Sequence, residues 1–194
     1  MRFTRSVLTV VAASLLLAGF VTAASARELS TTETRITATF ARVEFTSPGG
    51  ATRCNLTASG SFHSRKVPKV LETLTGYITS ASIGGCDPGT GSATVLTATL
   101  PWHVRYNGFA GSLPTIANIR AKLIGMAFRV REPNGLECLT SSTTTSPATI
   151  TFNVGALGAI TSVDLAETVS CFFIEASLRG TTNSIAPSFT ITLI

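Results

Sequence analysis

Strict alternation of apolar and polar residues is the feature that most constrains how this chain can fold. From Leu96 to Asn107 the even positions are apolar, among them Trp102 and Tyr106, while the odd positions are mostly polar. The same alternation runs through Cys54–Phe62 and Ala148–Val154. A period of two is typical of a β-strand with one face on the core and one in water. Helical periodicity is nearly absent, so the sequence predicts antiparallel sheets.

Further strands are predicted between turn signals such as Pro48-Gly49-Gly50, Asp87-Pro88-Gly89 and Pro133-Asn134-Gly135. Their expected ranges are Arg35–Phe45, Leu74–Ile83, Ile119–Val130, Leu136–Ser141, Ala159–Leu165, Phe172–Leu178 and Phe189–Leu193. Charged residues make up 13% of the chain and hydrophobic ones 44%, which excludes a disordered protein. We therefore expect an all-β fold, an antiparallel β-sandwich or barrel of about ten strands, with Pro101 marking a bend or an edge.

The second half of the chain echoes the first. Val43-Glu44-Phe45, a Pro-Gly-Gly turn and Cys54 are matched in order by Phe128-Arg129-Val130, a Pro-Asn-Gly turn and Cys138. The intervals from Cys54 to Cys86 and from Cys138 to Cys171 are 32 and 33 residues. We interpret the order of these matches as a duplication with halves at about 33–112 and 117–194. Open strand edges favour packing of both halves into one domain.

The first residues have the pattern of a secretory signal peptide. Arg2 and Arg5 precede a largely apolar run from Val7 to Val21, and Ala24-Ser25-Ala26 follows as a cleavage site. We expect a signal peptide at 1–26 and a single all-β domain at 27–194. The run is too short for a good membrane span, and no later stretch qualifies, so no transmembrane segment is expected after cleavage. The predicted location is secreted, either extracellular or in the cell envelope.

Four cysteines, Cys54, Cys86, Cys138 and Cys171, follow the expected cleavage site. An even number in an exported chain is typical of disulfides. Four cysteines allow three pairings, and the internal symmetry favours Cys54 with Cys86 and Cys138 with Cys171. The chain has no Cys-x-x-Cys motif and only two histidines, which are not at paired ligand spacing, so we expect neither a metal nor a cofactor.

The charge pattern bears on partners. The formal net charge of +5 includes Arg2 and Arg5, so the expected mature chain is only mildly basic. Only Arg65–Lys69 is locally dense in basic residues, and no aromatic residue interleaves with it, so no nucleic-acid partner is expected. One Trp and two Tyr are too few for the aromatic girdles of an outer-membrane barrel.

Several segments resemble a group of small exported Thr-rich all-β proteins of unknown function from soil actinobacteria. The resemblance rests on Cys54-Asn55-Leu56-Thr57, Gly60-Ser61-Phe62-His63-Ser64, Leu100-Pro101-Trp102-His103-Val104-Arg105-Tyr106 and Gly108-Phe109-Ala110-Gly111. It implies export and a bacterial source. It transfers no catalytic residue.

The strongest candidate for a binding surface is Trp102, His103, Arg105 and Tyr106. His103 and Arg105 would project from one face of a strand toward anionic or hydrogen-bonding groups, whereas alternation places Trp102 and Tyr106 in the core. A hydrolase using His63 or His103 is the weakest hypothesis, since no nucleophile motif is present. Glu132 and Glu137 flank one turn, where carboxylates are usually solvated rather than a glycosidase pair.

Two hypotheses for function remain ahead of a hydrolase. The first is an exported non-catalytic β-protein that acts through surface binding, at the cell envelope or extracellularly, and it predicts no enclosed cavity. The alternative is a carrier of a small apolar ligand in a β-barrel or between sheets. It predicts a cavity on the order of several hundred Å³ lined by Phe and Leu.

Overall fold

The protein is described by a computed structural model that covers residues 28–112, 115–171 and 174–194, without the side chains of 169–175. These residues form fourteen strands and two short 3₁₀ turns. The strands are β1 (Glu28–Thr31), β2 (Arg35–Ser47), β3 (Gly50–Phe62), β4 (Lys66–Pro68), β5 (Leu74–Gly84), β6 (Ser92–Val95), β7 (Trp102–Ala110), β8 (Asn118–Ile124), β9 (Ala127–Arg131), β10 (Glu137–Ser141), β11 (Ala148–Val154), β12 (Ile160–Cys171), β13 (Ile174–Ala186) and β14 (Ile191–Leu193). The 3₁₀ turns are η1 (Thr97–Thr99) and η2 (Ala156–Gly158).

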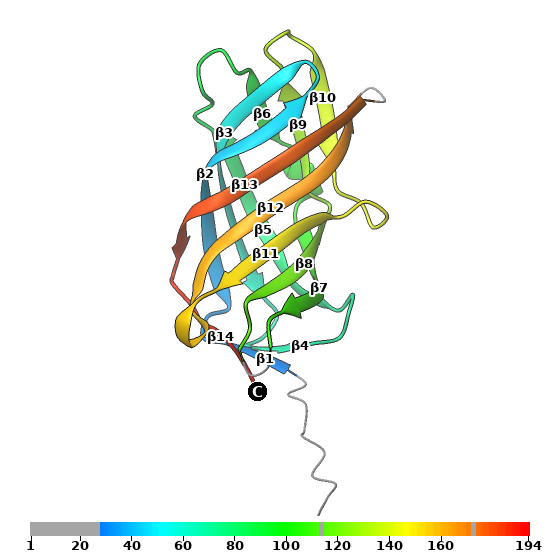
Figure 1. Cartoon of the computed structure of the whole chain (residues 1–194). Helices are drawn as coiled ribbons and strands as arrows, with labels where there is room; N and C mark the ends of the chain where they lie inside the picture. Colours follow the sequence, from blue (N-terminus) through cyan, green and yellow to red (C-terminus); the bar gives the residue numbers. More distant parts are fainter. Residues whose placement is uncertain (1–27, 113–114, 172–173) are drawn as a thin grey trace, which may run out of the picture.

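Eight long strands form a closed antiparallel barrel in the order β2-β3-β5-β7-β8-β11-β12-β13, with β13 pairing back to β2. Neighbours around the barrel follow one another along the chain, apart from the short elements inserted between them, so the topology is up-and-down (Figure 1). Register shifts in the β2–β3, β3–β5 and β13–β2 ladders bend the strands, as closure of a sheet requires. The all-β prediction is confirmed, and of the two predicted arrangements the barrel is found.

A three-stranded sheet lies at each end of the barrel (Figure 1). The sheet β10-β9-β6 is at the upper end of the figure, and β14-β1-β4 is at the lower end. These six short strands raise the number of strands above the ten expected. They also bury apolar side chains against the barrel interior, among them Phe128 of β9, Leu29 of β1 and Ile191 of β14. The two sheets therefore cover the interior at both ends.

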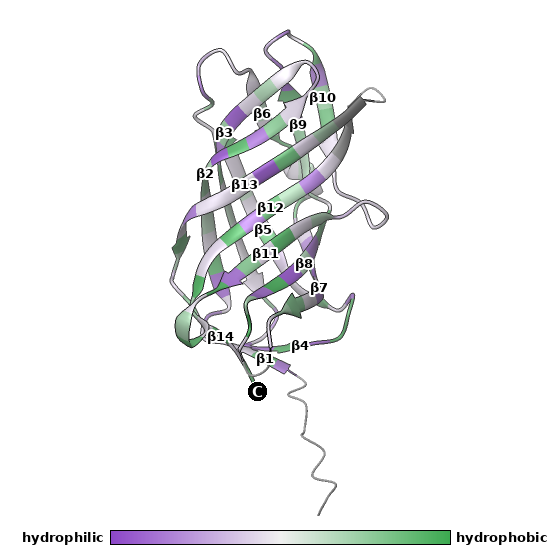
Figure 2. Cartoon of the chain, viewed as in Figure 1, coloured by the Kyte–Doolittle hydropathy of each residue, from purple (hydrophilic) through white to green (hydrophobic). Residues whose placement is uncertain are grey.

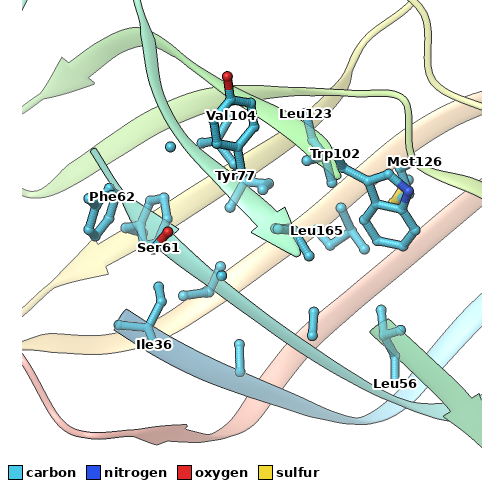
Figure 3. Close-up of a pocket in the computed structure, with 18 of the residues that line it drawn as sticks. Ile36, Leu56, Ser61, Phe62, Tyr77, Trp102, Val104, Leu123, Met126 and Leu165 are labelled. Carbon is cyan, nitrogen blue, oxygen red and sulfur yellow. The ribbon is translucent and has the colours of Figure 1, made fainter. Parts of the chain in front are cut away.

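Alternation along the strands places one set of side chains inside the barrel. In Figure 2 hydrophobic and hydrophilic positions succeed one another along the barrel strands. Two groups of aromatic rings lie in the interior. At the upper end Phe128 contacts Trp102 and Phe45, with ring centroids 5.7 and 5.3 Å apart. Toward the lower end Phe62 contacts Phe152 and Phe189, with centroids 6.2 Å apart in both pairs. Phe62 and Trp102 lie on opposite sides of the interior (Figure 3).

Several predicted strands differ from those observed, and two of them are divided between sheets. Alternation over Leu96–Asn107 predicted strand on both sides of Pro101, but Thr97–Thr99 form η1 and the strand begins only at Trp102. The bend expected at Pro101 is where the chain passes from β6, in the upper sheet, to β7 in the barrel. The strand expected at Ile119–Val130 is likewise divided, because Gly125 has a φ of 90° and separates β8 from β9. In both cases the apolar pattern continues along the chain while the chain passes from one sheet to another.

The structure does not show the predicted duplication. The first of the two matched hairpins is β2–β3, two 13-residue strands of the barrel wall. The second is β9–β10, two 5-residue strands of the upper sheet. The matched segments therefore occupy different sheets, and halves at 33–112 and 117–194 stay a prediction. The expected signal peptide at 1–26 lies outside the described residues.

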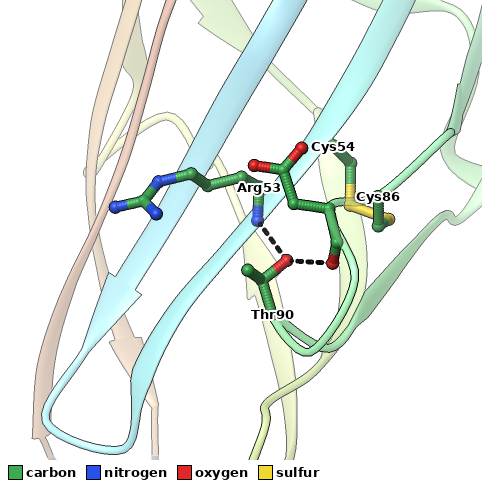
Figure 4. The surroundings of a disulfide bond; sticks show 5 residues. Arg53, Cys54, Cys86 and Thr90 are labelled. Carbon is green, nitrogen blue, oxygen red and sulfur yellow. Dashed lines mark hydrogen bonds between the residues drawn. A yellow bond between two sulfur atoms is a disulfide. The ribbon is translucent and has the colours of Figure 1, made fainter.

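The disulfide between Cys54 and Cys86 is confirmed (Figure 4). It joins β3 to the loop after β5, and hydrogen bonds hold the same loop. Thr90 Oγ1 accepts from the Arg53 amide at 3.3 Å and donates to the Asp87 carbonyl at 2.8 Å. The second predicted bridge pairs Cys138 with Cys171, whose side chain lies outside the described part of the chain. Two disulfides are therefore not shown, and this second pairing stays a prediction.

We expect loss of the Cys54–Cys86 bridge to lower the free energy of unfolding. The cysteines are 32 residues apart, so chain entropy predicts a loss of about 3–4 kcal/mol. Cys54→Ser, Cys86→Ser and the double variant should lose similar amounts in urea denaturation, because each removes the same bond. A double variant whose loss equals the sum of the two single losses would contradict the pairing in solution.

Candidate binding sites

A cavity of about 70 Å³ lies inside the barrel (Figure 3). Its walls are almost wholly apolar, and seven of the eight barrel strands contribute to them. The lining residues are Ile36, Ala38, Phe40, Leu56, Ala58, Gly60, Ser61, Phe62, Gly76, Tyr77, Ile78, Trp102, Val104, Leu123, Met126, Ile150, Phe152, Val163 and Leu165. A cavity needs about 10–15 Å³ to hold one water molecule, so this cavity is large enough. It nevertheless stays dry, because its walls offer the water no hydrogen-bond partner. The cavity therefore suits an apolar occupant.

Two glycines shape the wall between β3 and β5. A Cβ at Gly60 would lie 2.3 Å from the Tyr77 carbonyl oxygen, and one at Gly76 would lie 2.3 Å from the Ser61 carbonyl oxygen. Both distances are far inside van der Waals contact, so only glycine permits this approach of the two strands. The β3–β5 register also shifts between Ser59 and Gly60. Space at the cavity wall thus depends on two residues without side chains.

A second, smaller cavity of about 20 Å³ lies toward the lower end of the barrel. Phe62, Val104 and Phe152 line both cavities. The smaller cavity is also lined by Leu29, Val67 and Ile191, which belong to the lower sheet. The interior therefore holds two apolar cavities with shared wall residues, and β1, β4 and β14 cover it at this end.

The structure separates the four predicted binding residues into two pairs. Trp102 and Tyr106 are buried, with 1% and 4% of their surface exposed. The Trp102 indole donates a hydrogen bond to Thr99 Oγ1 at 2.9 Å and lines the cavity, and burial raises the pKa of the Tyr106 phenol. His103 and Arg105 alternate with these residues along β7 and are half-buried on its other face. The four side chains therefore do not form one surface patch.

His103 belongs instead to a row of three rings on the outside of the barrel. The Tyr77 ring centroid lies 4.9 Å from that of His63 and 5.2 Å from that of His103. Both histidines of the chain thus flank one tyrosine. Arg105, two residues further along β7, has a buried Nε without a hydrogen-bond partner. We name His63, Tyr77, His103 and Arg105 the ring face.

The geometry gives a hydrolase no support. Within the described ranges, neither His63 nor His103 has a hydrogen-bonded acid or hydroxyl, which a general base requires. Glu132 accepts a hydrogen bond from Ser47, whereas Glu137 forms an ion pair with Arg129 at 3.0 Å. These two carboxylates therefore hold different partners.

An ionisable group lies inside the barrel where no site was predicted. Glu167 of β12 has 6% of its surface exposed, and neither carboxylate oxygen has a hydrogen-bond partner. Desolvation raises its pKa to about 7. Alternation with the buried Val163 and Leu165 could have placed Glu167 inward from the sequence, but strand β12 was expected to end at Leu165. Tyr77 was missed because its ring neighbours, His63 and His103, come from two other segments of the chain.

We expect the free energy of unfolding to depend on pH through Glu167. Folding raises the pKa of Glu167, so ionising this carboxyl costs more in the folded state than in the unfolded state. The free energy of unfolding is therefore highest below pH 4.5 and falls as pH rises toward 7. The loss amounts to about 3 kcal/mol. Glu167→Gln should therefore be more stable than the natural chain at pH 8 and nearly equal to it at pH 4.5. Urea titrations from pH 4.5 to 8 measure this difference, and parallel curves would contradict it.

Comparison with known proteins assigns no family. No family model, no curated protein and no solved structure was found to match the chain. The described ranges contain no group of three or more potential metal ligands. They also contain no helix of the length and apolarity that a membrane span needs. Functional inference therefore rests on the barrel interior and on the ring face.

Proposed function

We propose that the protein binds a small apolar molecule inside its β-barrel. The observation that carries the proposal is the cavity of about 70 Å³, which is walled almost entirely by hydrocarbon. An apolar ligand gains contacts with these walls without displacing hydrogen-bonded water. Closed eight-stranded barrels are a common architecture for such binding, because their interior can hold one small ligand.

The cavity is smaller than the several hundred Å³ expected of a carrier. Trp102, Phe62 and Phe152 fill much of the interior, so the proposed ligand is small or is admitted by movement of these rings. Phe62 and Phe152 also separate the two cavities. Rotation of either ring would lengthen the space toward the lower sheet. A cavity that holds benzene measures about 150 Å³, so a short hydrocarbon chain or a single ring enters this one with movement of these rings.

Export is part of the proposal. The Cys54–Cys86 disulfide supports it, because such bonds persist in oxidising compartments. The predicted signal peptide, the predicted Cys138–Cys171 bridge and the resemblance to exported Thr-rich proteins agree with it. The protein would then carry its ligand outside the cell or in the envelope.

Benzene binding tests the proposed site. We expect saturable shifts of the methyl resonances of Leu56, Leu123 and Leu165, which line the cavity, and a rise in the melting temperature with benzene concentration. Ala58→Leu should fill the cavity and abolish the shifts, whereas Leu56→Ala should enlarge it and strengthen binding. Ala166→Leu, at an exposed position of β12, is the matched control. Equal binding by Ala58→Leu and the natural chain would refute the interior site.

The ring face favours a second function, recognition of an anionic, hydroxyl-rich polymer of the envelope. Aromatic rings stack on sugar faces, and the Arg105 guanidinium has donors for a carboxylate or phosphate. The row of His63, Tyr77 and His103 is the observation that supports this function. This second function keeps the surface-binding hypothesis but places the binding surface on residues from three segments of the chain.

Cosedimentation with an insoluble anionic polysaccharide tests the ring face. We expect Tyr77→Ala and Arg105→Ala each to weaken binding about tenfold. Arg179→Ala, an exposed arginine of β13, has the same charge change and serves as the control. A loss of affinity as large in Arg179→Ala would mean that net charge rather than the ring face determines binding.

A further inference from the structure

We propose that the interior ligand carries an amine, whose ammonium group pairs with the carboxylate of Glu167. This inference rests on the proposed function, because it adds a polar anchor to the apolar cavity. Among the described residues Glu167 is a buried carboxylate with both oxygens unpartnered. It therefore has two vacant acceptors, although it is not itself one of the residues that line the cavity.

Glu167 lies one inward position beyond the cavity wall. Val163 and Leu165 of β12 line the cavity, and Glu167 follows on the same face of the strand. Alternate residues of a strand are roughly 7 Å apart. Strand β12 runs toward the upper end of the barrel (Figure 1), and Glu167 follows Leu165 in that direction. A six-carbon chain is about as long as this step, so such a ligand reaches the carboxylate when the side chains between Leu165 and Glu167 move aside.

The described elements that pack against Glu167 present no charge to it. On β13 its register partner is Leu178, which is fully buried. On β11 Thr149 pairs with Ala166, so the fully buried Ala148 lies beside Glu167. Strand β10 contacts β12 and turns Cys138 and Thr140 inward. Thr140 Oγ1 is also buried without a partner, so this end of the interior holds a second vacant acceptor.

The energetics favour an amine over other polar ends. A buried carboxylate without a partner is strongly destabilising, and desolvation alone accounts for its raised pKa. The ammonium group of a ligand supplies both an opposite charge and hydrogen-bond donors to this carboxylate. A ligand hydroxyl donates only one neutral hydrogen bond, so it stabilises the buried carboxylate less than an ammonium group does. A ligand carboxylate would meet like charge and should be rejected.

Three six-carbon probes test the inference. We would measure binding of n-hexylamine, 1-hexanol and hexanoate by calorimetry at pH 8, where Glu167 is ionised and the amine is protonated. The natural chain should bind hexylamine about tenfold more tightly than hexanol and hexanoate least. Glu167→Gln keeps the size of the side chain and should reduce the preference for the amine to about twofold or less. At pH 5, where Glu167 is neutral, the natural chain should lose the same preference.

Each result bears on one of the two proposals. A preference for hexylamine that disappears in Glu167→Gln supports the inference. Binding of benzene and hexanol with no preference for hexylamine, or a preference that survives in Glu167→Gln, overturns the inference and leaves the apolar site intact. Failure of benzene and all three probes to bind overturns the proposed function and the inference together. Thr57→Gln, on the outward face of β3, controls for an added amide.

Discussion

Pairing of β13 with β2 closes the sheet, and the rest of the structure depends on this closure. Each of the eight barrel strands then has a neighbour on both sides, so its backbone groups are paired within the molecule. Closure also separates the side chains of every strand into an inner and an outer set. The inner set encloses the apolar cavity, while the outer set brings His63, Tyr77 and His103 together. Both candidate sites are products of the same closed sheet.

The interior is covered at both ends, and this determines its chemistry. The upper sheet places Phe128 against Trp102, and the lower sheet places Leu29 and Ile191 beside the second cavity. Water is thereby excluded from the neighbourhood of Glu167, whose carboxylate is unpartnered. In a solvated barrel mouth the same residue would be an ordinary surface acid. Burial makes it the one described interior position where a charged ligand group would gain most.

Local patterns predicted the strands well where one strand belongs to one sheet. Alternation located β3, β10 and β11, and it placed Trp102 and Tyr106 in the core. It was wrong at Leu96–Pro101 and across Gly125, where the chain moves from one sheet to another while its hydrophobic residues continue. It also ended β12 too early, because Glu167 interrupts the apolar sequence. Alternation reports that a side chain is buried but not in which sheet.

The sequence by itself determined the fold class and the face of each strand that is buried, and it favoured the Cys54–Cys86 pairing that the structure confirms. These follow from residue types, from spacing and from the period of a strand, which are properties of neighbouring residues. The tertiary structure alone decided between a sandwich and a barrel, left the cavity between Phe62 and Trp102, and isolated Glu167. Those depend on which strands meet across the sheet and how their side chains fill the enclosed volume. No local pattern encodes either, because packing is settled among residues far apart in the chain.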